Sequence, residues 1–214
     1  MTIWDISRAL TNDLAPWPGD TRFRFELTAR LGENAVVNVG AIRMGVHNGS
    51  HADATFHFDN SGATIDLANL EIYLGPATVL DLSAGFAGNT GGDIDVEHLR
   101  DLEQPELRTP RLLLKTGVWP DSTRFPDRIP VISPAVAEWL RDHGVRLIGL
   151  DLPSVDLIEA KVLQNHHALA QCGIVIVESL DFSWVKAGRY NLAALPLKIS
   201  GGDAAPVRAV LWRD

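Results

Sequence analysis

The sequence contains a single cysteine, Cys172, so no disulfide can form within the chain, and a reducing compartment is compatible with it. No cationic residue adjoins Cys172 in the sequence, which favours a small apolar helix residue over a reactive thiol. The N-terminal segment carries Asp5, Arg8 and Asp13 where a secretory signal would need an apolar run. We therefore expect no export, no membrane-spanning segment and a cytoplasmic location.

Basic residues are also scarce, with 19 Lys and Arg against 27 Asp and Glu and a net charge of -8. They are spread without clusters, so the chain lacks the basic face that binds nucleic acid or an anionic membrane. A glycine-rich dinucleotide fingerprint and a P-loop are both missing, which argues against an enzyme that depends on a nucleotide cofactor. Neither nucleic acid nor a membrane is expected as a partner.

The hydrophobic content of 46% over 214 residues is enough for one substantial core, and we expect a single domain spanning residues 1–214. Short apolar runs bounded by turn residues are typical of strands covered on both faces, whereas an alternating run is typical of a half-exposed strand. The buried strands are predicted at 77–82, 111–116, 145–150 and 174–177, and the alternating one at 36–46.

Two helices are predicted in the second half of the chain. One begins with Ser133 as N-cap and Pro134 at the first helical position, and it ends at Gly144. The other covers about 161–172 and ends at Gly173, a residue that tolerates the left-handed turn after a helix. Strands that alternate with helices predict an α/β fold, with more β-structure in the first half.

Three of the seven histidines and a carboxylate lie within eleven residues, from His47 to His57. Imidazole and carboxylate are ligands that zinc and similar ions accept, so the cluster predicts a metal site. The Asn-Gly-Ser turn that follows His47 is expected to bring His51 beside it, and Asp53 shares the side of His51 if the backbone is extended. Asp53 can then hold one ion or bridge two, with His57 at the edge to move protons. The alternative is a solvated histidine-rich loop that binds no stoichiometric metal.

Glu178 follows a buried apolar run, and a carboxylate at the end of a buried strand needs a cation or a metal unless it reaches solvent. His166 lies twelve residues earlier in the helix that leads into this strand, so a helix-turn-strand unit can return both to one end of the sheet. Spacing alone does not choose between His166 and its neighbour His167. His98 and His143 have no other candidate ligands near them and are expected at the surface.

These residues carry a resemblance to the bacterial kynurenine formamidases, or arylformamidases, a group of cyclase-like metal-dependent hydrolases. The most specific match is the pattern His, three residues, His, one residue, Asp, three residues, His, which is met in full from His47 to His57. The other matching segments are Trp4-Asp5-Ile6-Ser7, Trp17-Pro18-Gly19-Asp20, Val37-Asn38-Val39-Gly40, Tyr73-Leu74-Gly75-Pro76, 143–147, 151–156, 166–178, 194–198 and 206–211. The resemblance therefore runs almost from end to end.

The resemblance implies a swivelling β/β/α fold, in which a mixed and largely buried sheet is flanked by helices. It implies two Zn²⁺ ions per subunit, for which Mn²⁺ or another divalent metal is an alternative. One ion would be held by His47, His51 and Asp53, and the other by Asp53 with His166 and Glu178. The choice of His166 follows from the family motif, whose ligand lies seven residues before the glycine that ends the helix.

The resemblance also implies a reaction, the hydrolysis of N-formyl-L-kynurenine to L-kynurenine and formate in tryptophan degradation. His57 matches the catalytic acid and base of the family, and Trp17 matches a position that contacts the substrate. The family is typically homodimeric. One departure is Thr55, which stands where the family usually has proline, two residues before His57; no ligand is lost by it.

Two other functions stay open from the sequence. The same ligands would serve an enzyme that opens another aryl amide, isatin or a cyclic imide, and comparing the turnover of these compounds separates the two. A non-catalytic metal-binding or ligand-binding module is the third hypothesis, which would be favoured if His57→Ala changed no measured behaviour.

Overall fold

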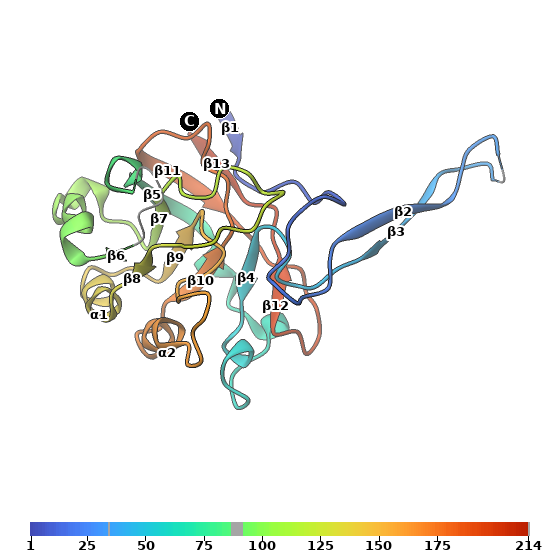
Figure 1. The fold of residues 1–214 in the computed structure, drawn as a ribbon. Helices are drawn as coiled ribbons and strands as arrows, with labels where there is room; N and C mark the ends of the chain where they lie inside the picture. The colour runs from blue at the N-terminus through green and yellow to red at the C-terminus, as the bar shows by residue number, and fades with distance from the viewer. Residues whose placement is uncertain (34, 87–91, 214) are drawn as a thin grey trace.

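A mixed sheet of nine strands runs through the molecule in the computed structural model, which describes residues 1–33, 35–86 and 92–213. In order across the sheet, the strands are β1 (Thr2–Asp5), β13 (Val210–Arg213), β11 (Gly188–Ala193), β5 (Leu74–Asp81), β7 (Arg111–Lys115), β9 (Leu147–Leu150), β10 (Val175–Glu178), β4 (His51–Asp53) and β12 (Ala204–Pro206). The four central strands from β5 to β10 are parallel, and the flanking strands pair antiparallel. Because β1 pairs with β13, the two ends of the chain lie side by side (Figure 1).

The two α-helices, α1 (Pro134–Asp142) and α2 (Gln164–Gln171), pack against one face of this sheet. Six 3-10 helices and a short parallel pair of strands, β6 (Asp93–Ile94) with β8 (Val131–Ile132), complete the body of the described chain. The 3-10 helices are η1 (Thr55–His57), η2 (Ile65–Leu67), η3 (Leu70–Tyr73), η4 (Ser83–Gly85), η5 (Val96–Glu103) and η6 (Pro105–Leu107). The sheet and its helices confirm the α/β class.

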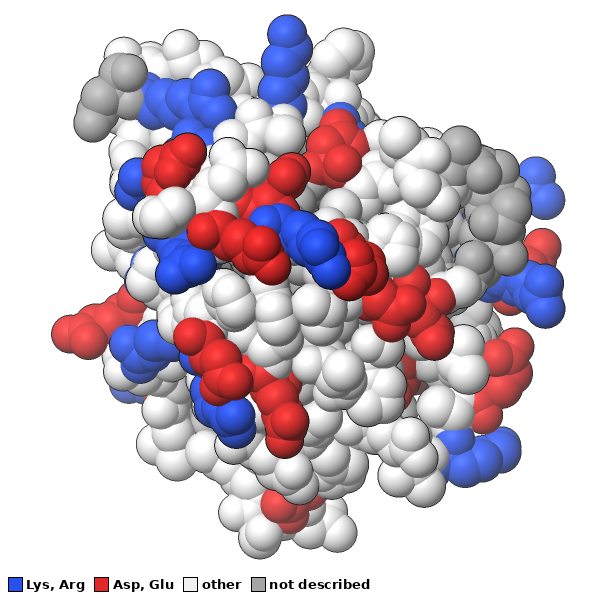
Figure 2. All heavy atoms as spheres, turned by 90° about the vertical axis from the view of Figure 1, so that its left-hand side faces the viewer, with Lys and Arg blue, Asp and Glu red and all other residues white. Residues whose placement is uncertain are grey.

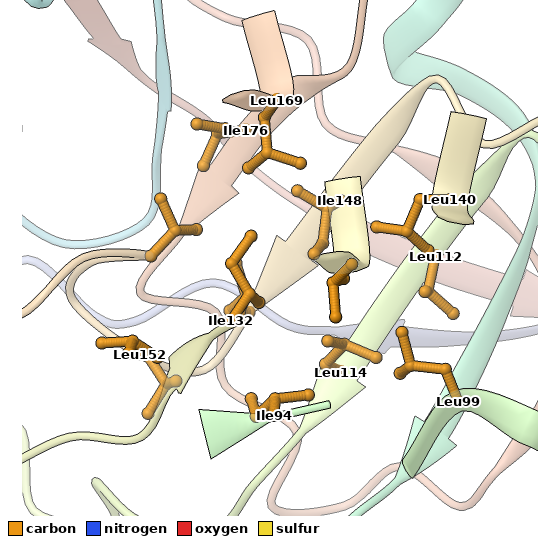
Figure 3. Packing of buried hydrophobic residues seen from close by; sticks show 14 of the residues in the cluster. Ile94, Leu99, Leu112, Leu114, Ile132, Leu140, Ile148, Leu152, Leu169 and Ile176 are labelled. Atoms are coloured by element: carbon orange, nitrogen blue, oxygen red, sulfur yellow. The ribbon is translucent and has the colours of Figure 1, made fainter. Parts of the chain in front are cut away.

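Alternate side chains of the central strands enter two different cores. On β7, Leu112 and Leu114 face the helices, whereas Leu113 faces the other side of the sheet. Successive side chains of a strand point to opposite faces, so a continuous apolar run is what a sheet covered on both faces requires. Figure 3 shows the helix-side core, in which Leu140 of α1 and Leu169 of α2 lie over the strand residues.

The opposite face is covered by loops and 3-10 helices rather than by α-helices. Its core includes Ile6, Ile65 of η2, Tyr73 of η3 and Phe182 together with strand residues. The central strands of the sheet are therefore buried on both sides, as the four apolar runs predict.

The predicted helices are present with small differences at their ends. Pro134 occupies the first turn of α1, and Ser133 is its N-cap residue, although the Ser133 side chain makes no capping hydrogen bond. Gly173 follows α2 with a φ of +70°, a left-handed conformation that favours glycine. The second helix begins at Gln164 rather than near 161, because the preceding residues form bends and turns.

A two-stranded arm projects from the body and is the largest departure from the sequence prediction (Figure 1). It consists of β2 (Arg24–Ala29) and β3 (Val39–Arg43), which pair antiparallel with each other. The predicted strand at 36–46 exists only as β3, and its partner β2 was not predicted. Every residue of β3 is exposed, so its alternation does not mark a face packed on the core of this chain.

The charged side chains of one face are mixed in sign. Figure 2 shows acidic and basic side chains interspersed on the side that lies at the left of Figure 1, rather than basic side chains gathered in one patch. No helix among the described residues is long and apolar enough to cross a membrane.

Candidate metal centre

The pleat of the sheet brings three of the predicted ligands onto one face. Strand β4 pairs antiparallel with β10, and His51 lies directly opposite Glu178. Asp53 is two residues from His51 and shares its face, whereas Ala52 between them is buried in the opposite core. Helix α2 covers the face of His51, Asp53 and Glu178, and its His166 is buried there.

The ligand atoms form two groups joined by Asp53. In the first, Asp53 Oδ1 lies 3.3 Å from His47 Nδ1 and 3.4 Å from His51 Nε2. In the second, His166 Nε2 lies 3.5 Å from Asp53 Oδ2 and 3.7 Å from Glu178 Oε1. Ordinary N–H···O hydrogen bonds are about 2.7–3.2 Å long, but atoms bound at about 2.0–2.2 Å to one tetrahedral ion lie roughly 3.3–3.6 Å apart. Both groups therefore have the spacing of metal ligands.

Three atoms at the centre of the cluster are buried without a hydrogen-bond partner among the described residues: His51 Nε2, Asp53 Oδ1 and Asp53 Oδ2. An unsatisfied polar atom away from water is costly, and for a carboxylate the cost is larger. A cation between the two oxygens and the imidazoles would satisfy all three atoms. The residues present thus fit a divalent metal.

Each of the three histidines turns its other ring nitrogen to an acceptor. Metal-binding histidines nearly always donate that second N–H to a carboxylate or a backbone carbonyl, which fixes the ring and leaves the other nitrogen for the ion. The pairs are His51 Nδ1 with Gly49 O at 2.8 Å, His166 Nδ1 with Asp156 Oδ2 at 2.7 Å, and His47 Nε2 with Asp203 Oδ2 at 3.0 Å. The nitrogens that remain are the ones in the two ligand groups.

The predicted turn after His47 is present and depends on Gly49. Gly49 has a φ of +69°, and a Cβ there would come within 2.7 Å of the Leu10 side chain. Ser50 then anchors the start of β4, since its hydroxyl donates to the Ser179 carbonyl at 2.7 Å. The turn brings the His47 and His51 rings to a centroid separation of 4.8 Å.

The pKa values of the cluster show how its charges are balanced when no cation is bound. Burial lowers the pKa of His47, but the carboxylates of Asp53 and Asp203 outweigh this effect and raise it to about 9. Burial is likewise outweighed at His166, where the surrounding carboxylates raise the pKa to about 10. Burial and the charge of Asp53 raise the pKa of Glu178. Protonated imidazoles balance the buried acids, and a metal ion would take the place of those protons.

His57 lies at the edge of the cluster, in η1, with a side chain 30% exposed. Burial and the nearby His47 and His166 lower its pKa, although the carboxylates of Asp53 and Asp203 act in the opposite direction. Nδ1 of His57 lies 3.5 Å from Asp203 Oδ2. Among the described residues no partner lies at its Nε2, and a neutral imidazole with one free nitrogen can accept or donate a proton near pH 7.

A cavity of about 390 Å³ opens over the cluster. Its polar floor includes the three candidate ligand histidines, His57 and Glu178, and its wall includes Trp17, Trp119 and Phe125. Phe125 makes edge-to-face contacts with both tryptophans, with ring centroids 5.3 and 5.8 Å away. The cavity thus combines a metal-ligating floor with an aromatic wall, a combination that suits a small aromatic substrate.

The structure brings together the seven residues that were assigned to the site, and it adds two carboxylates. His166 Nε2 lies in the second ligand group, whereas His167 contacts the ring of Phe58 at 5.1 Å and belongs to no such group among the described residues. Asp156 and Asp203, the acceptors for His166 and His47, were missed because no local pattern marks them. Asp156 falls in a segment that matches the family, 151–156, but nothing in the sequence marked its role. Asp203 follows two glycines, as an ordinary turn residue would.

Comparison with known proteins places the chain in a family. A family model described as "Putative cyclase" matches residues 4–157. The chain belongs to this cyclase family. The matched residues include the first ligand group and His57, whereas α2 and β10 follow them in the chain.

Full-length relatives extend the match across α2 and β10. The chain is 44% identical over 212 residues to a kynurenine formamidase of Geobacillus thermodenitrificans, covering 99% of this chain and 98% of that protein. It is 40% identical over 208 residues to a kynurenine formamidase of Bacillus cytotoxicus, covering 97% and 95%.

Solved structures show the same fold. A predicted metal-dependent hydrolase from Bacillus stearothermophilus aligns with a TM-score of 0.78 at 25% identity, covering 98% of this chain and 97% of that one. Isatin hydrolase A from Labrenzia aggregata aligns with a TM-score of 0.84 at 24% identity, covering 98% and 93%.

Proposed function

We propose that the protein is an arylformamidase that hydrolyses N-formyl-L-kynurenine to L-kynurenine and formate in tryptophan degradation. The observation that carries this proposal is the match of 40–44% identity along nearly the whole chain to proteins named kynurenine formamidase. The aromatic wall above a metal-ligating floor supports it, because the substrate is an aryl amide whose ring and formyl group need different surroundings.

Two Zn²⁺ ions are the proposed cofactors, with Mn²⁺ or another divalent ion able to use the same donors. His47, His51 and Asp53 would hold one ion, and Asp53, His166 and Glu178 would hold the other. When bound, such ions make water nucleophilic near neutral pH and polarise a carbonyl oxygen. The unsatisfied Asp53 oxygens and His51 Nε2 support the assignment independently of any relative.

His57 is the proposed acid and base. Water adds to the formyl carbon, the carbon–nitrogen bond breaks, and the departing aryl nitrogen must gain a proton to leave as an amine. Asp203 lies toward Nδ1 of His57, so Nε2 is the atom that would take a proton from water and pass it to that nitrogen. The lowered pKa of His57 supports this role, because it keeps the ring neutral at neutral pH.

Trp17 is the proposed contact for the aryl ring. It lines the cavity, and its edge-to-face contact with Phe125 fixes the orientation of the indole. Stacking of two aromatic rings contributes about 0.5–1.5 kcal/mol beyond the area that it buries.

We further propose that the protein is cytoplasmic and forms a homodimer. Each chain is proposed to be one catalytic domain that spans residues 1–214. The β2–β3 arm supports the dimer, because it exposes apolar side chains on both strands, including Phe25 and Ile42 at 47% and 64%. Exposed apolar surface of this kind on an isolated hairpin favours contact with a second copy. We expect Ile42→Asp to weaken the dimer in analytical ultracentrifugation, whereas Leu67→Asp, at an exposed apolar residue of η2, should not.

The test of function is direct. Purified protein is mixed with N-formyl-L-kynurenine, the absorbance of kynurenine is followed with and without a chelator, and metal is counted per chain. We expect turnover that a chelator abolishes and zinc restores, and faster turnover than with isatin. Turnover that survives complete removal of metal would refute the mechanism, and preferred turnover of isatin would refute the substrate.

A further inference from the structure

A tight turn places Asp20 next to Trp17 on the cavity wall. The Trp17 carbonyl accepts a hydrogen bond from the Asp20 N–H at 3.0 Å, Pro18 occupies the second position, and Gly19 has a φ of +94° at the third. This is the arrangement of a type II turn, in which the first and fourth Cα atoms lie less than about 7 Å apart. Both Trp17 and Asp20 line the cavity, so an aromatic residue and an acidic residue lie next to each other at its wall.

The Asp20 carboxylate has no partner within the described chain. It is exposed, and it makes no hydrogen bond or ion pair with any residue that the structure describes. The other carboxylate in the cavity lining is Glu178, which belongs to the ligand cluster. Asp20 is therefore the acidic group that remains available to a bound molecule.

The described lining of the cavity contains no lysine or arginine. Arg8 is buried behind the wall, with its guanidinium 4.0 Å from the centre of the Trp119 ring, and its Nη2 donates to the carbonyls of Trp119 and Asp151. An amino acid substrate carries an ammonium and a carboxylate at its far end. The cavity wall offers a charged partner to the ammonium but no cationic side chain to the carboxylate.

We propose that Asp20 binds the α-ammonium of the substrate while Trp17 holds its aryl ring, an inference that rests on the proposed function. Three carbon atoms separate the ring from the α-nitrogen of formylkynurenine, so the two groups are close enough to meet residues at the two ends of one tight turn. The α-carboxylate stays in solvent at the cavity mouth. Asp20 is thus a specificity residue that selects an amine-bearing aryl formamide.

Substrate analogues test the choice of the ammonium over the carboxylate. The wild-type protein is compared on N-formylkynuramine, which lacks the carboxylate, and on 4-(2-formamidophenyl)-4-oxobutanoate, which lacks the ammonium. We expect the first to keep most of the kcat/KM of formylkynurenine and the second to lose about 5- to 20-fold, the effect of one solvent-accessible charge-assisted hydrogen bond. A preference for the carboxylate-bearing analogue would overturn the proposal, and would indicate that the metal-ligating floor attracts the anion instead.

A variant with a matched control tests the residue. Asp20→Asn should lower the ratio of kcat/KM for formylkynurenine to that for formanilide by about 5- to 20-fold, because formanilide has no ammonium. Asp13→Asn makes the same change of charge at an exposed residue outside the cavity lining, and it should leave the ratio unchanged. Metal content and thermal midpoint are measured for all three proteins, so that a folding defect is recognised.

The outcomes separate this proposal from the proposed function. Wild-type protein that does not hydrolyse formylkynurenine refutes the function, and the Asp20 proposal with it. Wild-type activity combined with an equal loss on both substrates in Asp20→Asn, or with no loss on either, refutes the role of Asp20 alone. A selective loss on the ammonium-bearing substrates, greater at low than at high ionic strength, supports it.

Discussion

Binding of zinc to the metal-free protein should release about two protons per chain at pH 7.5. The perturbation is removal of metal with a chelator followed by titration with zinc. Each ligand group contains one histidine whose pKa is raised by neighbouring carboxylates, His47 to about 9 and His166 to about 10. A histidine must be neutral to bind an ion, so each group must lose its proton when zinc binds.

The magnitude follows from these values. At pH 7.5 a group with a pKa of 9 or 10 is more than about 95% protonated, so each ion displaces close to one proton. Because both pKa values are raised, protons compete with zinc for His47 and His166 throughout the range below about pH 9. Between pH 8 and pH 7 the apparent affinity for each ion should therefore fall about tenfold, or roughly 1.4 kcal/mol.

Isothermal titration calorimetry measures both quantities. Titrations at one pH in buffers of different ionisation enthalpy give the number of protons released, and titrations at pH 7 and 8 give the change in affinity. His167→Ala removes an imidazole that lies beside His166 in the sequence but outside the ligand groups, and it should leave the proton count unchanged. Release of fewer than about one proton per chain, or equal affinity at the two pH values, would refute the electrostatic reasoning.

Three further predictions concern residues around the metal centre. His57→Gln should lower kcat for formylkynurenine by about 100- to 10,000-fold with metal content unchanged, and retained turnover in a metal-loaded variant would exclude His57 as the acid and base. Asp203→Asn removes the carboxylate that holds His47 Nε2 at 3.0 Å and should weaken metal affinity about 10- to 100-fold, measured by competition with a chelator; unaltered affinity would contradict this. Thr55→Pro should raise the thermal midpoint by about 1–4 °C. The Thr55 N–H has no acceptor among the described residues, so proline removes no hydrogen bond there. Ala54 has the extended backbone that a following proline requires, with ψ of 154°. A lower midpoint would show that the local backbone does not accept proline.

Much of the candidate metal centre could be predicted from the sequence because the first group of its residues is local. The spacing from His47 to His57 is set by a turn and a short extended segment, and both are properties of a few consecutive residues. Glu178 was recognisable because it ends an apolar run that cannot bury an isolated carboxylate without a partner. His166 needed the family motif, since spacing along α2 does not distinguish it from His167.

The arm and the supporting carboxylates could not be predicted from the sequence. Strand β2 lies on a hairpin whose strands are mostly exposed and belong to neither core of the described residues, so its residues do not carry the pattern of a buried face. Asp203 reaches His47 only because β12 pairs with β4 across the sheet. Such a pairing joins residues far apart in the chain, and no local signal records it.

The sequence by itself determined the kinds of candidate ligand, the turn that brings His47 beside His51, and the continuous apolar runs that make β7, β9 and β10 buried strands. These features depend on the chemistry and backbone preferences of neighbouring residues. Only the tertiary structure decided that His51 lies opposite Glu178, that both oxygens of Asp53 face imidazoles from separate elements, and that Asp20 shares the cavity wall with Trp17. The register of two strands and the packing of a helix on a sheet are set by the burial of the whole core, and a single residue shift would turn His51 and Asp53 to the opposite face.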